Sequence, residues 1–240
     1  MARKGRTRLR PLVRLVAQAF PALDAEDTIR RGCVLVDDSA RTNPASLVRA
    51  DAALALATPP PLRGETKLHA ALAAFEVRVA GRIALDLGAS TGGFTRVLLA
   101  EGARRVYAVD AGHGQLLGSL RQEPRVVNLE RTNLAELSRR LVPEPIDVVT
   151  ADLSYVSLAA AIPQLNGRVR FVFDAELVAL VKPQFELALP EPPRRHEVEP
   201  AFEIAAAGIE RAGWRVVAGG RSPIRGAGGS EELFVHARRR

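Results

Sequence analysis

Cysteine is almost absent from this sequence, with Cys33 the single one among 240 residues. One thiol cannot form an internal disulfide or a cysteine-rich metal site, and such scarcity favours a reducing cytoplasm. The four histidines show no metal-ligand spacing, so we expect no bound metal. Apolar runs of the roughly 20 residues that cross a membrane are also missing, and the first residues do not read as a signal peptide. These absences exclude a disulfide scaffold and predict no membrane partner.

Positive charge is what the sequence has in excess, with a formal net charge of +7 and a pI of about 10.6. Such a balance favours a polyanionic partner. The charge is uneven, because Arg238, Arg239 and Arg240 end the sequence and more basic residues crowd its beginning. Charge alone does not separate RNA from DNA or an anionic membrane, and a generally arginine-rich composition is the alternative explanation. The candidate RNA contacts are Arg6, Arg8, Arg10, Arg14, Arg30 and Arg31.

A proline-rich segment at residues 58–64 (TPPPLRG) separates a small basic module, residues 1–57, from a larger domain, residues 65–240. Three consecutive prolines cannot continue a helix and behave as a short, stiff connector. The module's apolar residues recur at helical spacing in Leu9, Leu12, Val13, Val16 and Phe20.

Asp24 is placed to cap a second helix, which Gly32 ends. Residues 33–36 predict a strand and residues 37–39 a turn. Two helices, a strand, a turn and a second strand, all edged with arginines, are typical of a compact RNA-binding module.

In the larger domain, short apolar stretches alternate with helical ones, which predicts an α/β fold with a parallel, doubly wound, Rossmann-like sheet. Ligands bind such sheets at the carboxyl ends of the strands. The proline-rich residues 190–200 predict a loop. The expected strands are residues 82–87, 105–109, 126–129, 146–151, 177–181, 214–218 and 232–237.

The turn after the first of these strands predicts a cofactor loop. Its glycines let backbone approach a ligand closely, and Gly93 opens a helix whose amino end is electropositive. The spacing is not the G-x-G-x-x-G of dinucleotide enzymes. Asp86 could instead meet a cationic group, such as the amino group of S-adenosylmethionine, and Asp110 ends the next strand where acids grip ribose hydroxyls. The loop residues are Asp86, Gly88, Ala89, Ser90, Thr91, Gly92, Gly93 and Phe94.

The alternative for this loop is a tight turn capped by Ser90 or Thr91, with Asp110 as a helix cap. The loop and Asp110 together favour a cofactor pocket over that alternative.

Beyond the loop and Asp110, seven stretches of the sequence resemble the TlyA-like family of ribosomal RNA 2′-O-methyltransferases, also labelled hemolysins. They are LDLGASTGGFT, ARRVYAVD, GHGQL, ERTN, DLSYVS, VALVKPQFE and SPI, in that order from residue 85 to residue 224. Residues 30–36 resemble the family's amino-terminal RNA-binding module, which is similar to one in a small-subunit ribosomal protein. The resemblance implies S-adenosylmethionine as cofactor, with Asn133 and Asp152 as further contacts, and a ribosomal RNA cytidine or ribosomal subunit as substrate.

The resemblance also implies an FtsJ-type catalytic tetrad at Lys67, Asp152, Lys182 and Glu232. The chemistry is reasonable, because a ribose hydroxyl is a poor nucleophile and a positioned lysine with a lowered pKa can serve as its base. Lys182 ends an apolar strand, where a lysine is costly unless it has a use. Lys67 as a solvated helix residue is the alternative at that position. Alternation along the last strand leaves only one of Glu231 and Glu232 facing the site, and the spacing favours Glu232.

Three departures from the family pattern concern the substrate side. Residues 187–200 (LALPEPPRRHEVEP) replace a glycine-rich stretch, Glu65 replaces a glycine before Lys67, and Ser230 stands where an asparagine is usual. The leading hypothesis is an RNA ribose 2′-O-methyltransferase. A catalytically weakened or inactive RNA-binding member is the alternative, and direct hemolytic activity is disfavoured because no membrane-spanning segment is present.

Overall fold

The computed structural model describes residues 8–58, 61–191, 193, 195–226 and 229–240. It divides into two compact units, Met1–Leu62 with Leu117–Gln122, and Arg63–Leu116 with Glu123–Arg240. Of the expected linker, Pro59 and Pro60 lie outside the described residues, as does Arg6 among the candidate RNA contacts. Helix α3 begins at Arg63, inside the stretch that was expected to connect the two parts.

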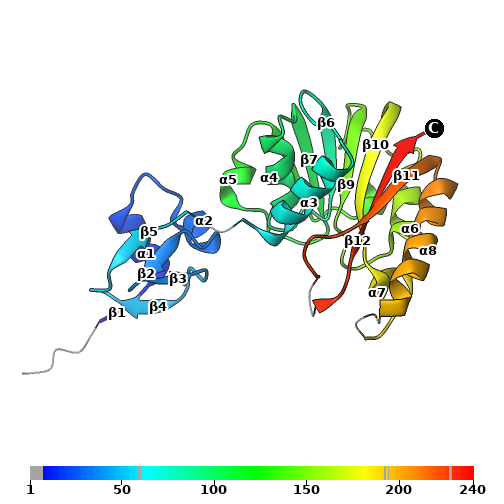
Figure 1. The fold of residues 1–240 in the computed structure, drawn as a ribbon. Helices are drawn as coiled ribbons and strands as arrows, with labels where there is room; N and C mark the ends of the chain where they lie inside the picture. Colours follow the sequence, from blue (N-terminus) through cyan, green and yellow to red (C-terminus); the bar gives the residue numbers. More distant parts are fainter. Residues whose placement is uncertain (1–7, 59–60, 192, 194, 227–228) are drawn as a thin grey trace, which may run out of the picture. The chain divides into compact units, whose positions relative to one another are not determined.

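The smaller unit is built from short strands and short helices (Figure 1), and it has its own apolar core. Strand β2 is the centre of a three-stranded antiparallel sheet between β3 and β5, and β1 pairs with β4. The elements are β1 (Leu9–Pro11), α1 (Leu12–Ala19), α2 (Ala25–Arg30), β2 (Val34–Val36), β3 (Ser39–Arg41), β4 (Leu47–Arg49) and β5 (Leu54–Leu56), and α5 (Gly118–Arg121) falls in the same unit.

The predicted helix cap is confirmed, because the side chain of Asp24 accepts a hydrogen bond of 2.9 Å from the backbone N–H of Asp27. The predicted strand and turn are also present, at β2 and in the turn before β3. The prediction that Leu9 belongs to the first helix is wrong, since Leu9 lies in β1 and α1 starts after Pro11. A proline disfavours helical backbone in the residue before it, which keeps Arg10 extended.

The larger unit is a seven-stranded sheet with strand order β11-β12-β10-β9-β6-β7-β8 (Figure 1). The strands are β6 (Ile83–Leu87), β7 (Arg105–Asp110), β8 (Val126–Glu130), β9 (Ile146–Ala151), β10 (Phe171–Val181), β11 (Trp214–Arg221) and β12 (Leu233–Arg239). The pairs among β6 to β10 are parallel, as predicted, but β12 is antiparallel to both of its neighbours. The sheet is therefore mixed, because the short connection from β11 to β12 permits only antiparallel pairing.

Helices cover both faces of the sheet. Successive side chains of β6 point to opposite faces. Ile83, Leu85 and Leu87 pack into the core that includes α8, whereas Ala84 packs with α3 and α4 on the other face. Asp86 shares the face of Ala84. The helices of this unit are α3 (Arg63–Ala74), α4 (Gly93–Ala100), α6 (Leu158–Ala161), α7 (Pro183–Glu186) and α8 (Val198–Arg211), with short 3-10 turns η1 (Leu134–Glu136), η2 (Ile162–Leu165) and η3 (Arg195–Glu197).

Two expectations for this unit are wrong. Residues 190–200 are not a loop throughout, since η3 and then α8 begin within them. Pro200 is the third residue of α8, where a missing N–H leaves no helical hydrogen bond unmade. Strand β10 starts at Phe171, six residues before the expected start, with a register shift between Phe171 and Glu176. Within the described part of the chain, no helix is long and apolar enough to cross a membrane.

Candidate active site

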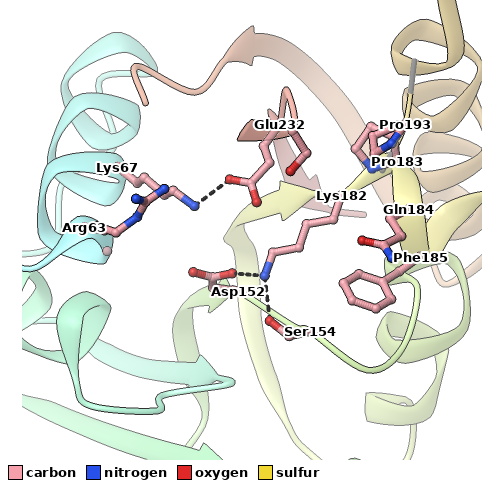
Figure 2. Close-up of a pocket in the computed structure, with 12 residues that line it drawn as sticks. Arg63, Lys67, Asp152, Ser154, Lys182, Pro183, Gln184, Phe185, Pro193 and Glu232 are labelled. Carbon is pink, nitrogen blue, oxygen red and sulfur yellow. Dashed lines mark hydrogen bonds and ion pairs between the residues drawn. The ribbon is translucent and has the colours of Figure 1, made fainter. Parts of the chain in front are cut away.

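A cavity of about 320 Å³ brings together the four residues of the expected tetrad (Figure 2). Asp152 directly follows β9, Lys182 directly follows β10 and Glu232 directly precedes the antiparallel β12, so all three lie at one edge of the sheet. Lys67 reaches the same cavity from α3. Four separate elements therefore supply these side chains.

The four residues form two ion pairs. Lys67 Nζ lies 2.5 Å from Glu232 Oε2, and each residue is only 6% exposed. Lys182 Nζ lies 2.6 Å from Asp152 Oδ1 and donates a 2.8 Å hydrogen bond to Ser154 Oγ. The first pair is buried, whereas the second is more open to solvent and so to an entering substrate.

The structure places Glu232, and not Glu231, at this cavity. Glu231 pairs with Arg221 at 2.7 Å and with Arg225 at 3.5 Å, outside the tetrad. Adjacent residues of an extended chain point to opposite sides, which explains why only one of the two glutamates faces Lys67.

The expected cofactor loop connects β6 to α4 and contacts the neighbouring strand ends. Gly88 has a φ of +80°, and a Cβ there would lie 2.6 Å from the carbonyl oxygen of Asp152, so the glycine is required. Asp110 Oδ2 accepts a 2.8 Å hydrogen bond from the N–H of Ser90, and Oδ1 accepts one of 2.7 Å from Gly112. A carboxylate held by backbone at the end of β7, beside a glycine-rich turn, fits the ribose hydroxyls of a nucleoside cofactor.

Asp86 does not lie on the surface of this loop, because it is fully buried. Its carboxylate accepts hydrogen bonds from the hydroxyls of Thr95 at 2.7 Å and Thr150 at 2.9 Å. Burial raises the pKa of Asp86 to about 6, although the two threonines act in the opposite direction. Its expected contact with the cofactor's amino group stays a prediction.

The other expected cofactor residues differ in exposure. Ser90 and Thr91 are exposed, whereas Ala89, Gly92 and Gly93 are buried. Phe94 packs in the core, stacked on Phe234 with 6.3 Å between ring centroids. Asn133 forms a capping box with Glu136 at the start of η1, so its side chain already has a structural use.

The candidate RNA contacts of the smaller unit fall into two groups. Arg8 and Arg14 are exposed, and Arg10 is half-buried. Arg30 pairs with Glu26 at 2.6 Å, and Arg31 lies 3.9 Å from the buried Asp27.

Sequence reasoning assigned no role to Ser154 or Arg63, which both line the cavity. Ser154 lies in the quoted DLSYVS stretch, but nothing local shows that it bonds Lys182. Glu65, a departure from the family pattern, forms a 2.8 Å ion pair with Arg96 and so links α3 to α4.

In the described part of the chain, no group of three or more His, Cys, Asp or Glu residues could hold a metal ion.

Comparison with known proteins adds to this geometry. The family described as FtsJ-like methyltransferase matches residues 62–239. The 16S/23S rRNA (cytidine-2′-O)-methyltransferase TlyA of Mycobacterium tuberculosis is 40% identical, over 99% of this chain and 91% of its own length. This chain belongs to the FtsJ-like methyltransferase family, in its TlyA group.

Solved structures agree with this membership. A hemolysin from Streptococcus thermophilus is 30% identical, with a TM-score of 0.72 over 98% of this chain and 90% of that one. An S-adenosylmethionine-dependent methyltransferase from Listeria monocytogenes is 14% identical and shares the fold, with a TM-score of 0.54 over 75% of this chain and 100% of its own. The sheet of this FtsJ-like chain is thus the Rossmann-like methyltransferase sheet, and the family's methyl donor is S-adenosylmethionine.

Proposed function

We propose that this protein transfers the methyl group of S-adenosylmethionine to the ribose 2′-hydroxyl of a cytidine in ribosomal RNA. The observation that carries the proposal is the meeting of Lys67, Asp152, Lys182 and Glu232 in one cavity beside the cofactor loop. The 40% identical relative is named as a 16S/23S rRNA cytidine-2′-O-methyltransferase, which supports both the acceptor atom and the class of RNA.

S-adenosylmethionine supplies an activated methyl group when bound. Lys182 Nζ would first release its own proton to water, and the neutral amine would then accept the proton of the ribose hydroxyl that takes the methyl group. Asp152 and Ser154 hold that amine between two acceptors, at 2.6 and 2.8 Å, and so aim its remaining positions at the cavity. Lys67, fixed by Glu232, presents a positive charge to the acceptor oxygen as its proton leaves. Much of the rate would come from this positioning.

Residues outside the tetrad would bind the methyl donor and the RNA. Asp110 and the exposed Ser90 and Thr91 would contact the donor, with the amino end of α4 behind them. The arginines of the smaller unit would bind RNA phosphates, since phosphate contacts supply affinity without reading sequence. Ribosomal RNA as substrate implies that the protein works in the cytoplasm.

The test is transfer of tritium from labelled S-adenosylmethionine to purified ribosomal subunits and to naked ribosomal RNA. We expect label in a 2′-O-methylcytidine after digestion to nucleosides. Label in neither substrate, from a protein that still binds the cofactor, would favour a binding protein without turnover. Label on a base instead of a ribose would contradict the role given to the tetrad.

A further inference from the structure

The amino-terminal part of α3 places a second basic residue beside Lys67 at the cavity. Arg63 lies four residues earlier, on the same side of the helix, and also lines the cavity (Figure 2). Its Nη2 donates hydrogen bonds to the backbone carbonyl of Arg225 and, at 3.2 Å, to that of Gly226. These carbonyls belong to the segment between β11 and β12, which leads to Glu232. Helix α3 therefore holds both Lys67 and the backbone that lies next to its carboxylate partner.

Gly226 is the residue of that segment that touches the carboxylate. A Cβ at Gly226 would overlap Glu232 Oε1 and lie 2.7 Å from Glu232 Cδ. The φ of Gly226 is not in the left-handed region, so its backbone admits an alanine. The obstacle to a side chain at this position is therefore the glutamate carboxylate, together with the Ser230 hydroxyl at 2.6 Å.

Glu232 is thus confined on two sides. Its Oε2 is paired with Lys67, and its Oε1 lies against the backbone of Gly226, which Arg63 ties to α3. We propose that Arg63 and Gly226 are positioning residues, which fix the Glu232 carboxylate and through it the ammonium group of Lys67. The proposal rests on the proposed function. Misplacement of a catalytic group by about 1 Å can cost on the order of 100-fold in rate, so this support should be visible in turnover.

The experiment uses the full chain with Arg63→Ala, Arg63→Lys and Gly226→Ala, each alone and combined with Glu232→Gln. We expect Gly226→Ala to lower kcat by about 100-fold and Arg63→Ala by about 10-fold, with KM for both substrates nearly unchanged. Arg63→Lys should recover part of the loss, because the lysine ammonium group can donate at least one of the two hydrogen bonds. In the Glu232→Gln background the same changes should cost almost nothing further, since they act through the missing carboxylate.

Two matched controls lie in the same unit. Arg78→Ala removes an exposed arginine, and Gly220→Ala adds a Cβ that meets its nearest atom, in Phe75, at an ordinary 3.6 Å. Both should keep wild-type turnover. Thermal melting and S-adenosylhomocysteine binding show that each variant folds.

Effects of the Arg63 and Gly226 changes that are as large with Glu232→Gln as without it would overturn the proposal. So would an Arg63→Ala variant that raises only the KM for RNA, which would make Arg63 a phosphate contact.

A crystal structure of Gly226→Ala tests the geometry without turnover. We expect Glu232 Oε2 to lie beyond 4 Å from Lys67 Nζ, and an unchanged pair would refute the inference. Absence of methylation by the wild type would count against the proposed function alone.

Discussion

Replacement of Asp86 by asparagine should stabilise the larger unit at neutral pH and leave it little changed in acid. Asp86 is completely buried on the face of β6 that packs against α4, and both of its oxygens accept hydrogen bonds from threonine hydroxyls. Asparagine keeps one acceptor, and its amide can donate to the other hydroxyl, so the packing is nearly conserved. The substitution removes mainly the cost of burying a charge.

The size of the effect follows from the raised pKa. A pKa of about 6 in the folded state, against 3.8 in the unfolded chain, means that the folded protein holds the proton more tightly. The stability that this proton provides is complete below pH 3.8 and is lost as the pH rises through about 6. The full loss is about 3 kcal/mol, and roughly half of it develops between pH 5 and pH 7.5.

Urea denaturation at pH 5 and pH 7.5 measures this directly. Trp214 is the single tryptophan and is buried in the larger unit, so its fluorescence reports the unfolding of that unit. We expect the stability difference between Asp86→Asn and wild type to grow by about 1.5 kcal/mol between the two pH values. The difference isolates Asp86, because other titrating groups contribute to both proteins. A difference that is independent of pH, or that shrinks as the pH rises, would refute the reasoning.

Four further predictions concern the site, the sheet and the smaller unit. Lys182→Ala should abolish methyl transfer but leave S-adenosylhomocysteine binding within a few-fold of wild type by calorimetry, and retained turnover would refute its role as proton acceptor. Glu232→Gln should lower kcat by 100-fold or more, whereas Glu231→Gln should change it less than threefold; equal losses would contradict the placement of the two glutamates. Burial lowers the pKa of His236, so the free energy of unfolding should fall as the pH drops below about 6.5. His236→Asn should reduce this loss in urea titrations, and an identical loss in the variant would show that the ring is not responsible. Deletion of residues 1–56 should weaken RNA binding and reduce its salt dependence in filter binding, and unchanged affinity would exclude a contribution from the smaller unit.

Much of the sheet could be predicted because its strands are short apolar runs, and residues that directly follow such runs meet at one edge. Asp110 was expected from this pattern, whereas Asp152 and Lys182 were implied by the family resemblance and agree with the pattern because each directly follows a strand. The apolar pattern does not mark a strand where polar residues lie inside it. Glu176 and Asp174 interrupt the apolar pattern, which hid the first six residues of β10.

Local sequence patterns do not predict contacts between segments that are far apart in the chain. Lys67 and Glu232 are 165 residues apart, and only the family resemblance implied that they belong to one site. The contact of Gly226 with the glutamate has no local signal either, because its φ is one that any residue adopts. Asp86 and Ala84 are two residues apart in β6 and therefore face the same side of the sheet. The burial of Asp86 follows from this only once the helices that cover that face are known.

The central claim is that the four residues around the cavity form a methyl-transfer site for ribose. It is tested most directly by incubating ribosomal RNA with tritiated S-adenosylmethionine and either the wild-type protein or Lys182→Ala, followed by nucleoside analysis. The account predicts label in 2′-O-methylcytidine with the wild type and none with the variant. Label in a methylated base, or equal label with both proteins, would contradict it.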